Sequence, residues 1–194
     1  MALLERKRPV APLGGLCRHE IGDRYPRFVL TDDTFSDVLT ANEAYAASFQ
    51  LAELEGNAAK GLAVLTCMDS RIDPLGMLGL VPGDAKILRN AGARVTDDVL
   101  RTLVLAVYLL TVERIMVVAH TGCAMAGGGE DRVHHAIEAA GGPDTRSISF
   151  LTTDDQEASL RTDVQRVRSW PYLGKVVVGG FIYDLKTGRL RPVC

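Results

Sequence analysis

The chain has 194 residues, of which 47% are hydrophobic and 24% charged, and its formal net charge is -2. This length fits one domain, and the composition is that of an ordinary globular protein with a sizeable core. The nearly balanced charge argues against nucleic acid as a partner. No apolar run reaches the roughly 18 residues that a membrane-spanning helix needs, so no membrane association is expected.

The N-terminal segment differs from the rest of the chain. Its first thirty residues carry six Lys and Arg against three Asp and Glu, with three prolines among them. The segment lacks the apolar stretch of a secretory signal. We interpret residues 1–30 as an N-terminal arm, either a loosely held leader or a segment that wraps a neighbouring subunit, and expect residues 31–194 to form a single domain.

The four cysteines fall into two kinds. Cys17 lies in the arm and Cys194 ends the chain, whereas Cys67 and Cys123 lie inside strongly apolar segments. Without an export signal, the reducing cytoplasm is the expected compartment. Interior cysteines there more often bind a metal or take part in chemistry than form a disulfide.

Apolar periodicity predicts the elements in chain order. A helix with an apolar stripe is expected over residues 34–54. Short continuous runs rich in Val, Ile and Leu predict buried strands at residues 62–67, 86–89, 115–120 and 176–182. Helices are expected over residues 99–110 behind an N-cap at Thr96, over 130–140, and over 153–169. The last strand leads into a hairpin between residues 181–185 and 189–193, with Gly188 in the left-handed region.

The alternation of strands and helices predicts an α/β fold. We expect a mostly parallel central sheet flanked by helices, with the C-terminal hairpin adding an antiparallel edge strand. In such sheets ligands bind at the carboxyl ends of the strands, where loops converge.

Two of these strand ends carry unusual side chains. The first is followed by Cys67, Asp69 and Arg71, which share one side of an extended segment because they are two residues apart. The third ends at His120, and Cys123 follows three residues later, a spacing that makes the two side chains neighbours in a turn. If the two strands lie near each other, two thiolates and one imidazole converge on a single point.

This donor set is the one that zinc prefers. Structural zinc sites have four protein ligands, whereas a catalytic site has three and leaves the fourth position to water, whose pKa the metal lowers to about 7. Asp69, paired with the planar guanidinium of Arg71, would stay ionised and accept a hydrogen bond from zinc-bound hydroxide. Alternatively, Asp69 is itself the fourth ligand and closes the site.

The quoted residues also occur in a recognisable order. Cys67-Met68-Asp69-Ser70-Arg71, followed by His120-Thr121-Gly122-Cys123, resembles the signature of the β-class carbonic anhydrases. The stretches Arg89-Asn90-Ala91-Gly92 and Asn42-Glu43-Ala44-Tyr45 with Phe49 are also similar to that family, and the compact layout is most similar to its small bacterial branch.

The resemblance implies reversible hydration of carbon dioxide to bicarbonate, with Cys67, His120 and Cys123 as zinc ligands and an Asp69–Arg71 dyad. It also implies a homodimer or a tetramer of dimers with the site at the subunit interface, where the backbone of Gly92 lines the substrate pocket.

Three points stay open at the level of sequence. The family usually has Gly after the second cysteine, where this chain has Ala124, which resists a left-handed backbone but tolerates a helical turn. Related enzymes of the same fold hydrolyse carbon disulfide or carbonyl sulfide. A low-activity zinc-binding or bicarbonate-sensing protein with a closed metal site is the third possibility.

Overall fold

The computed structural model describes residues 34–194. The expected arm over residues 1–30 and Cys17 lie outside the described residues. Within the described part, no helix has the length and apolar character needed to cross a bilayer.

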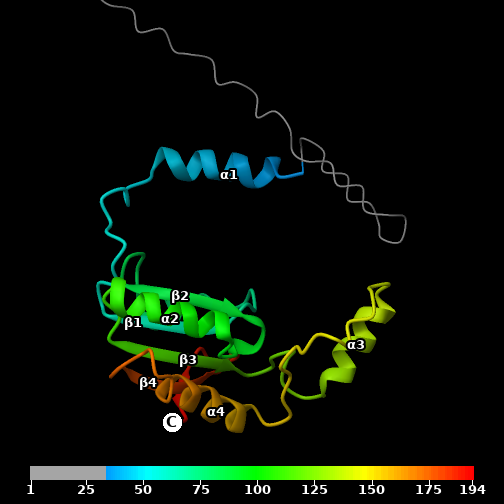
Figure 1. Ribbon diagram of the computed structural model, residues 1–194. Coiled ribbons are helices and arrows are strands. Elements are labelled where there is room, and N and C mark those ends of the chain that lie inside the picture. Colours follow the sequence, from blue (N-terminus) through cyan, green and yellow to red (C-terminus); the bar gives the residue numbers. More distant parts are fainter. Residues whose placement is uncertain (1–33) are drawn as a thin grey trace, which may run out of the picture.

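A five-stranded sheet forms the centre of the fold (Figure 1). Its strands follow the order β2-β1-β3-β4-β5; the first three pairings are parallel and the β4–β5 pairing is antiparallel. The expected α/β class and the antiparallel edge are therefore confirmed. The strands are β1 (Leu62–Cys67), β2 (Ala85–Asn90), β3 (Arg114–His120), β4 (Val177–Tyr183) and β5 (Leu190–Pro192).

One face of the sheet is covered by two helices, α2 (Asp97–Leu109) and α4 (Gln156–Arg168). Both begin with a side-chain cap: Thr96 accepts a hydrogen bond from the amide of Val99, and Asp155 accepts one from that of Ala158. The main core lies between these helices and the sheet, and its members include Leu65, Leu100, Leu103, Ile115, Val117 and Val164.

The opposite face has a thinner cover. Leu62, Val64 and Val118 are buried there beneath a short segment that contains the 3-10 turn η1 (Gly76–Leu78). Towards the β4–β5 edge the apolar side chains on this face, among them Phe181, are only partly buried. Part of this face is therefore exposed and could pack against another protein surface.

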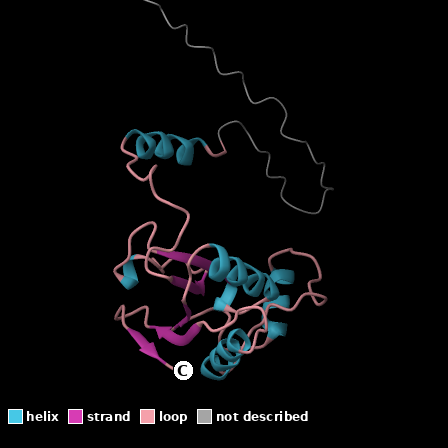
Figure 2. Cartoon of the chain, turned by 60° about the vertical axis from the view of Figure 1, so that its left-hand side comes forward, coloured by secondary structure: helices cyan, strands magenta, loops and turns pink. Residues whose placement is uncertain are grey.

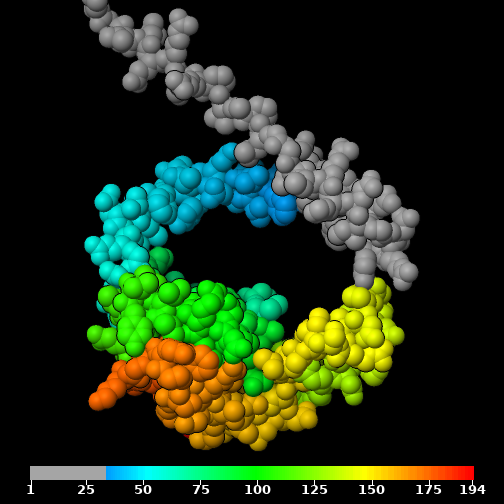
Figure 3. Space-filling model, in the orientation of Figure 1, coloured from blue at the N-terminus to red at the C-terminus, as the bar shows by residue number. Residues whose placement is uncertain are grey.

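Helix α1 (Ser36–Ala47) stands apart from the sheet, as Figures 1 and 2 both show. A helix forms within the expected range 34–54, but it ends at Ala47, its apolar side chains are not confined to one face as the predicted stripe requires, and none of its residues is buried. Its large apolar side chains and those that flank it are exposed, namely Phe35, Val38, Leu39, Tyr45 and Phe49. Figure 3 shows the same separation in space-filling form.

The remaining boundaries differ little from expectation. Helix α3 (Glu130–Ala139) projects beside the sheet, and the turn before β5 has Gly188 at φ +68°. Helix α4 starts at Gln156 and not at Thr153, because Thr153 forms an isolated parallel bridge with Ala126.

Candidate metal centre

The centre lies where β1 and β3 end at one edge of the sheet. These strands are parallel neighbours, with Thr66 opposite Val118. Cys67 is the last residue of β1 and His120 the last of β3. The chain then turns through Gly122, whose φ of +66° suits glycine, and returns Cys123 beside the other two.

The three expected ligands are brought together. Their donor atoms, one each from Cys67, His120 and Cys123, all lie within 4.8 Å of one another, and all three residues are buried. The ring Nδ1 of His120 lies 3.0 Å from the carbonyl oxygen of Thr121. This contact assigns the proton to Nδ1 and leaves the Nε2 lone pair directed at the sulfurs.

The imidazole also provides a test of fit for a metal. Nε2 of His120 is buried and has no hydrogen-bond partner among the described residues. A buried polar atom without a partner is costly, and it is rare in native proteins. A cation held between Nε2 and the two sulfurs would satisfy it, so the donor set fits a metal ion.

Backbone amides contact both sulfurs. The amide of Gly92 donates to Sγ of Cys67 at 3.4 Å. Burial raises the pKa of the Cys123 thiol, and a hydrogen bond from the backbone of Met125 opposes that shift. Amide donors directed at sulfur stabilise the thiolate form, which is the form that binds metals.

Asp69 and Arg71 form the expected dyad. Nε of Arg71 donates to Oδ1 of Asp69 at 2.9 Å, Nη2 donates to Oδ2 at 2.6 Å, and the Arg71 amide donates to Oδ1 at 3.0 Å. These hydrogen bonds hold the pKa of the Asp69 carboxyl well below its usual range. The carboxylate lies beside the centre, with Oδ2 at 3.9 Å from Nε2 of His120, and its orientation is fixed by the guanidinium.

Arg89 ties β2 to the loop that carries the dyad. Its Nε donates to the carbonyl oxygen of Cys67 at 3.0 Å, and its Nη2 donates to that of Asp69 at 2.7 Å. The 89–92 stretch that the sequence singled out therefore contacts the centre twice, through the Arg89 side chain and through the Gly92 amide.

Ala124 does not strain the loop after Cys123. The non-glycine residues with positive φ in the described chain are Ala93, Thr111 and Leu151. Ala124 lies in a turn outside the left-handed region, as its side chain requires, so replacing the usual glycine leaves the local geometry intact.

Two further contacts lie next to the residues of the centre, and no sequence motif predicts either of them. Nε2 of Gln156 donates to the carbonyl oxygen of His120 at 3.1 Å. Arg94 and Asp163 form an ion pair at 2.6 Å. The two partners are 69 residues apart, and neither belongs to a motif, so only the folded chain reveals the pairing.

The chain is similar in sequence and in fold to known carbonic anhydrases. A family model described as carbonic anhydrase matches residues 62–190. "Beta-carbonic anhydrase 1" of Mycobacterium tuberculosis is 34% identical over 160 residues, which is 81% of this chain and 96% of that protein. A carbon disulfide hydrolase of Acidithiobacillus thiooxidans is 30% identical over 152 residues, which is 68% of this chain and 76% of that one.

Among solved structures, a carbonic anhydrase from Streptococcus mutans superposes with a TM-score of 0.77 at 37% identity, covering 82% of this chain and 97% of that one. A second, from Glaciozyma antarctica, gives a TM-score of 0.68 at 34% identity, covering 80% and 95%. The chain therefore belongs to the β-carbonic anhydrase family, and these relatives support its assignment as a carbonic anhydrase, a lyase.

Proposed function

We propose that the protein is a zinc enzyme that interconverts carbon dioxide and bicarbonate, with Cys67, His120 and Cys123 as the metal ligands. The observation that carries this proposal is the buried set of two sulfurs and an unpartnered imidazole nitrogen within 4.8 Å. Two thiolates and an imidazole favour zinc over harder cations such as magnesium. Three ligands leave one coordination position for solvent.

The protein's own residues then have defined tasks. If Cys67, His120 and Cys123 hold a zinc ion, it would make a water acidic enough to act as a nucleophile near neutral pH. Asp69, kept ionised by Arg71, accepts a hydrogen bond from that water and orients its lone pair towards carbon dioxide. The proton that leaves the site passes to buffer. Gly92 would line the substrate side of the centre with its backbone.

Two alternatives are weaker. Carbon disulfide hydrolysis is suggested by relatives of that name, but the match to the mycobacterial β-carbonic anhydrase extends over more of both proteins. A closed, low-activity zinc site would need Asp69 on the metal. Against it, both oxygens of Asp69 are bonded to Arg71.

Stopped-flow measurement tests the proposal. We expect zinc-loaded protein to accelerate carbon dioxide hydration over buffer, and chelator-treated protein to lose that acceleration and recover it when zinc is restored. Sulfide release from carbon disulfide and carbonyl sulfide is measured in parallel. Zinc-loaded protein without hydration activity at any pH would refute the proposal, and sulfide release in its place would support the hydrolase alternative.

We also propose that residues 31–194 act as one domain in a cytoplasmic homodimer or a tetramer of dimers, with residues 1–30 as an arm. The three cysteines of the described chain are free thiols, which suits a reducing compartment. Among residues 34–194, no residue of helix α1 is buried, and its large apolar side chains are exposed. Exposed apolar groups gathered in this way mark interaction sites, and the partly buried apolar side chains near Phe181 are a second such surface.

Mass measurement in solution tests the assembly. Light scattering is expected to give at least twice the monomer mass for the parent. The variant Leu39→Glu, which places a charge among the exposed apolar side chains of α1, should dissociate, whereas Glu43→Gln on the same helix should not. A monomeric parent, or a Leu39→Glu variant that assembles like the parent, would contradict the proposed role of α1.

A further inference from the structure

The loop that donates to Cys67 is tightly confined. It is the 3-10 turn η2 (Ala91–Ala93), and Gly92 at its centre has φ +78°. A Cβ on Gly92 would come within 3.1 Å of Cβ of Met125, on the loop that follows Cys123. Gly92 therefore lies in close contact with both sulfur-bearing segments, and a shift of a few tenths of an ångström would alter its hydrogen bond to Cys67.

Arg94 holds this loop through its backbone. The side chain of Asn90 accepts a hydrogen bond from the Arg94 amide at 2.8 Å and donates one to the Arg94 carbonyl oxygen at 2.7 Å. This reciprocal pair closes the loop over residues 90–94. The position of Gly92 therefore depends on where Arg94 is fixed.

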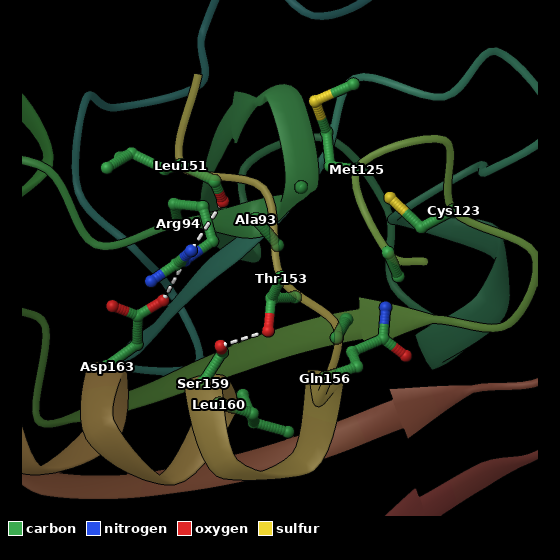
Figure 4. Close-up of a pocket in the computed structure, with 13 residues that line it drawn as sticks. Ala93, Arg94, Cys123, Met125, Leu151, Thr153, Gln156, Ser159, Leu160 and Asp163 are labelled. Carbon is green, nitrogen blue, oxygen red and sulfur yellow. Dashed lines mark hydrogen bonds and ion pairs between the residues drawn. The ribbon is translucent and has the colours of Figure 1, made fainter. Parts of the chain in front are cut away.

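The side chain of Arg94 is fixed by α4 and by the loop before it. Its Nε donates to Oδ2 of Asp163 at 2.6 Å, and its Nη1 donates to the carbonyl oxygen of Leu151 at 2.6 Å. Figure 4 shows both contacts. Asp163 is buried in α4 between Leu160 and Val164, so its carboxylate depends on Arg94 for compensation.

The side of the η2 loop that faces α4 contains a small cavity. A cavity of about 20 Å³ separates the ion pair from Cys123, with Thr153, Gln156 and Ser159 among its lining residues (Figure 4). Such a volume has room for about one water molecule. On this side of the loop the polar contacts of Arg94 therefore add to the packing of the buried Ala93.

Two residues that adjoin Arg94, its chain neighbour Ala93 and its hydrogen-bond partner Leu151, have an uncommon backbone conformation. Ala93, which precedes it, has φ +57°, and Leu151, which accepts its hydrogen bond, has φ +58°. Left-handed backbone at residues other than glycine persists only where surrounding contacts enforce it, and such residues cluster at functional sites. Arg94 adjoins both positions, since its backbone is bonded to Asn90 next to Ala93 and its guanidinium donates to Leu151.

We propose that the Arg94–Asp163 ion pair is a positioning pair for the metal centre. It holds the Gly92 amide against Sγ of Cys67 and so controls how firmly the centre retains its ion. This inference rests on the proposed zinc site but is separate from the reaction catalysed there. Replacing a residue that orients a metal ligand without itself binding the metal commonly lowers metal affinity by about 10–100-fold.

Metal release from the full-length, zinc-loaded protein tests this role. Asp163→Asn keeps the side-chain shape and removes the charge, whereas Arg94→Lys keeps the charge and loses the fork that reaches both partners. The matched control is Asp98→Asn, which breaks an exposed ion pair with Arg101 on α2. Zinc transfer to an excess of chromophoric chelator gives the rate, and the sulfur-to-cobalt absorption band of cobalt-substituted protein reports independently on the bonds of Cys67 and Cys123 to the metal.

We expect both pair variants to release zinc about 10–100-fold faster than the parent and to shift the cobalt band. The control should match the parent in both measurements. If Asp163→Asn does not fold, the zinc release rate and the cobalt band of Arg94→Lys test the positioning role. Folded pair variants that release zinc at the parental rate with an unchanged band, and differ only in melting temperature, would overturn the positioning role. A parent that holds zinc without hydrating carbon dioxide would overturn the proposed function alone, and a parent that holds no zinc would overturn both.

Discussion

Replacement of Cys67 by serine separates metal binding from folding. Cys67 is the last residue of β1, all six residues of which are buried. The substitution removes one sulfur donor and leaves His120 and Cys123 in place. We therefore expect Cys67→Ser to lose its zinc and its carbon dioxide hydration activity while it keeps the fold.

The size of the effect follows from the number of donors. Structural zinc sites with four protein ligands contribute about 10–16 kcal/mol, or roughly 3 kcal/mol per donor. A neutral hydroxyl retains little of what a thiolate contributes, so zinc affinity should fall by about 10²-fold. The cost to folding is smaller, about 1–2 kcal/mol for one polar replacement in the core, against a total stability of roughly 5–15 kcal/mol for a domain of this kind.

Three measurements check this expectation. Metal analysis after dialysis against a weak chelator gives the zinc content, stopped-flow gives the hydration rate, and thermal unfolding of the zinc-free proteins gives the stability difference. Cys194→Ser is the matched control, because Cys194 is a free and partly exposed thiol outside the donor set. Stoichiometric zinc in Cys67→Ser would show that Cys67 is not a ligand.

Three other outcomes are expected. Arg71→Gln removes the fork that orients Asp69 and should lower kcat/KM for carbon dioxide by about 10–100-fold while zinc content stays unchanged; parental kinetics would exclude the dyad from the reaction. Because burial raises the pKa of the Cys123 thiol, zinc must displace its proton. Affinity measured by chelator competition should therefore fall as pH decreases, and a flat profile would contradict this linkage. The amides of Phe150 and Thr152 lower the pKa of Glu130 below 4.5. The stabilisation this gives is complete above pH 4.5 and is lost as pH falls through the lowered value, so the melting temperature of the parent should fall more steeply in acid than that of Glu130→Gln.

The strands and the donor set could be predicted because their signals are local and strong. Residues 62–67 form a continuous apolar run buried on both faces, and β1 has the predicted bounds. The two strand ends carried distinctive side chains, and a parallel sheet brings such ends to one edge. Whether β1 and β3 are neighbours could not be read from the sequence, because β2 lies between them in the chain; the sheet order places β2 outside β1 and so brings β1 and β3 together.

The environment of α1 and the ion pair of Arg94 and Asp163 could not be predicted from the pattern of apolar and charged residues. The apolar residues between 34 and 54 predict a helix, but they do not say what covers it, and in the described part of the chain no residue of α1 is buried. The ion pair of Arg94 and Asp163 joins a loop to the interior of a helix. An arginine after a turn and an aspartate within a helix are ordinary in isolation, and their partnership arises only when α4 packs beside the sheet.

The position of the metal centre at the ends of two central strands also bears on how the protein matures. Cys67 and His120 are separated by about fifty residues of chain, so an ion between them would close a long loop that contains β2, α2 and β3. The pairing of β1 with β3 buries apolar side chains, so packing as well as a shared ion would hold the two strands together. We therefore expect the zinc-free protein to fold with its donors in place, and zinc added afterwards to restore hydration activity without refolding.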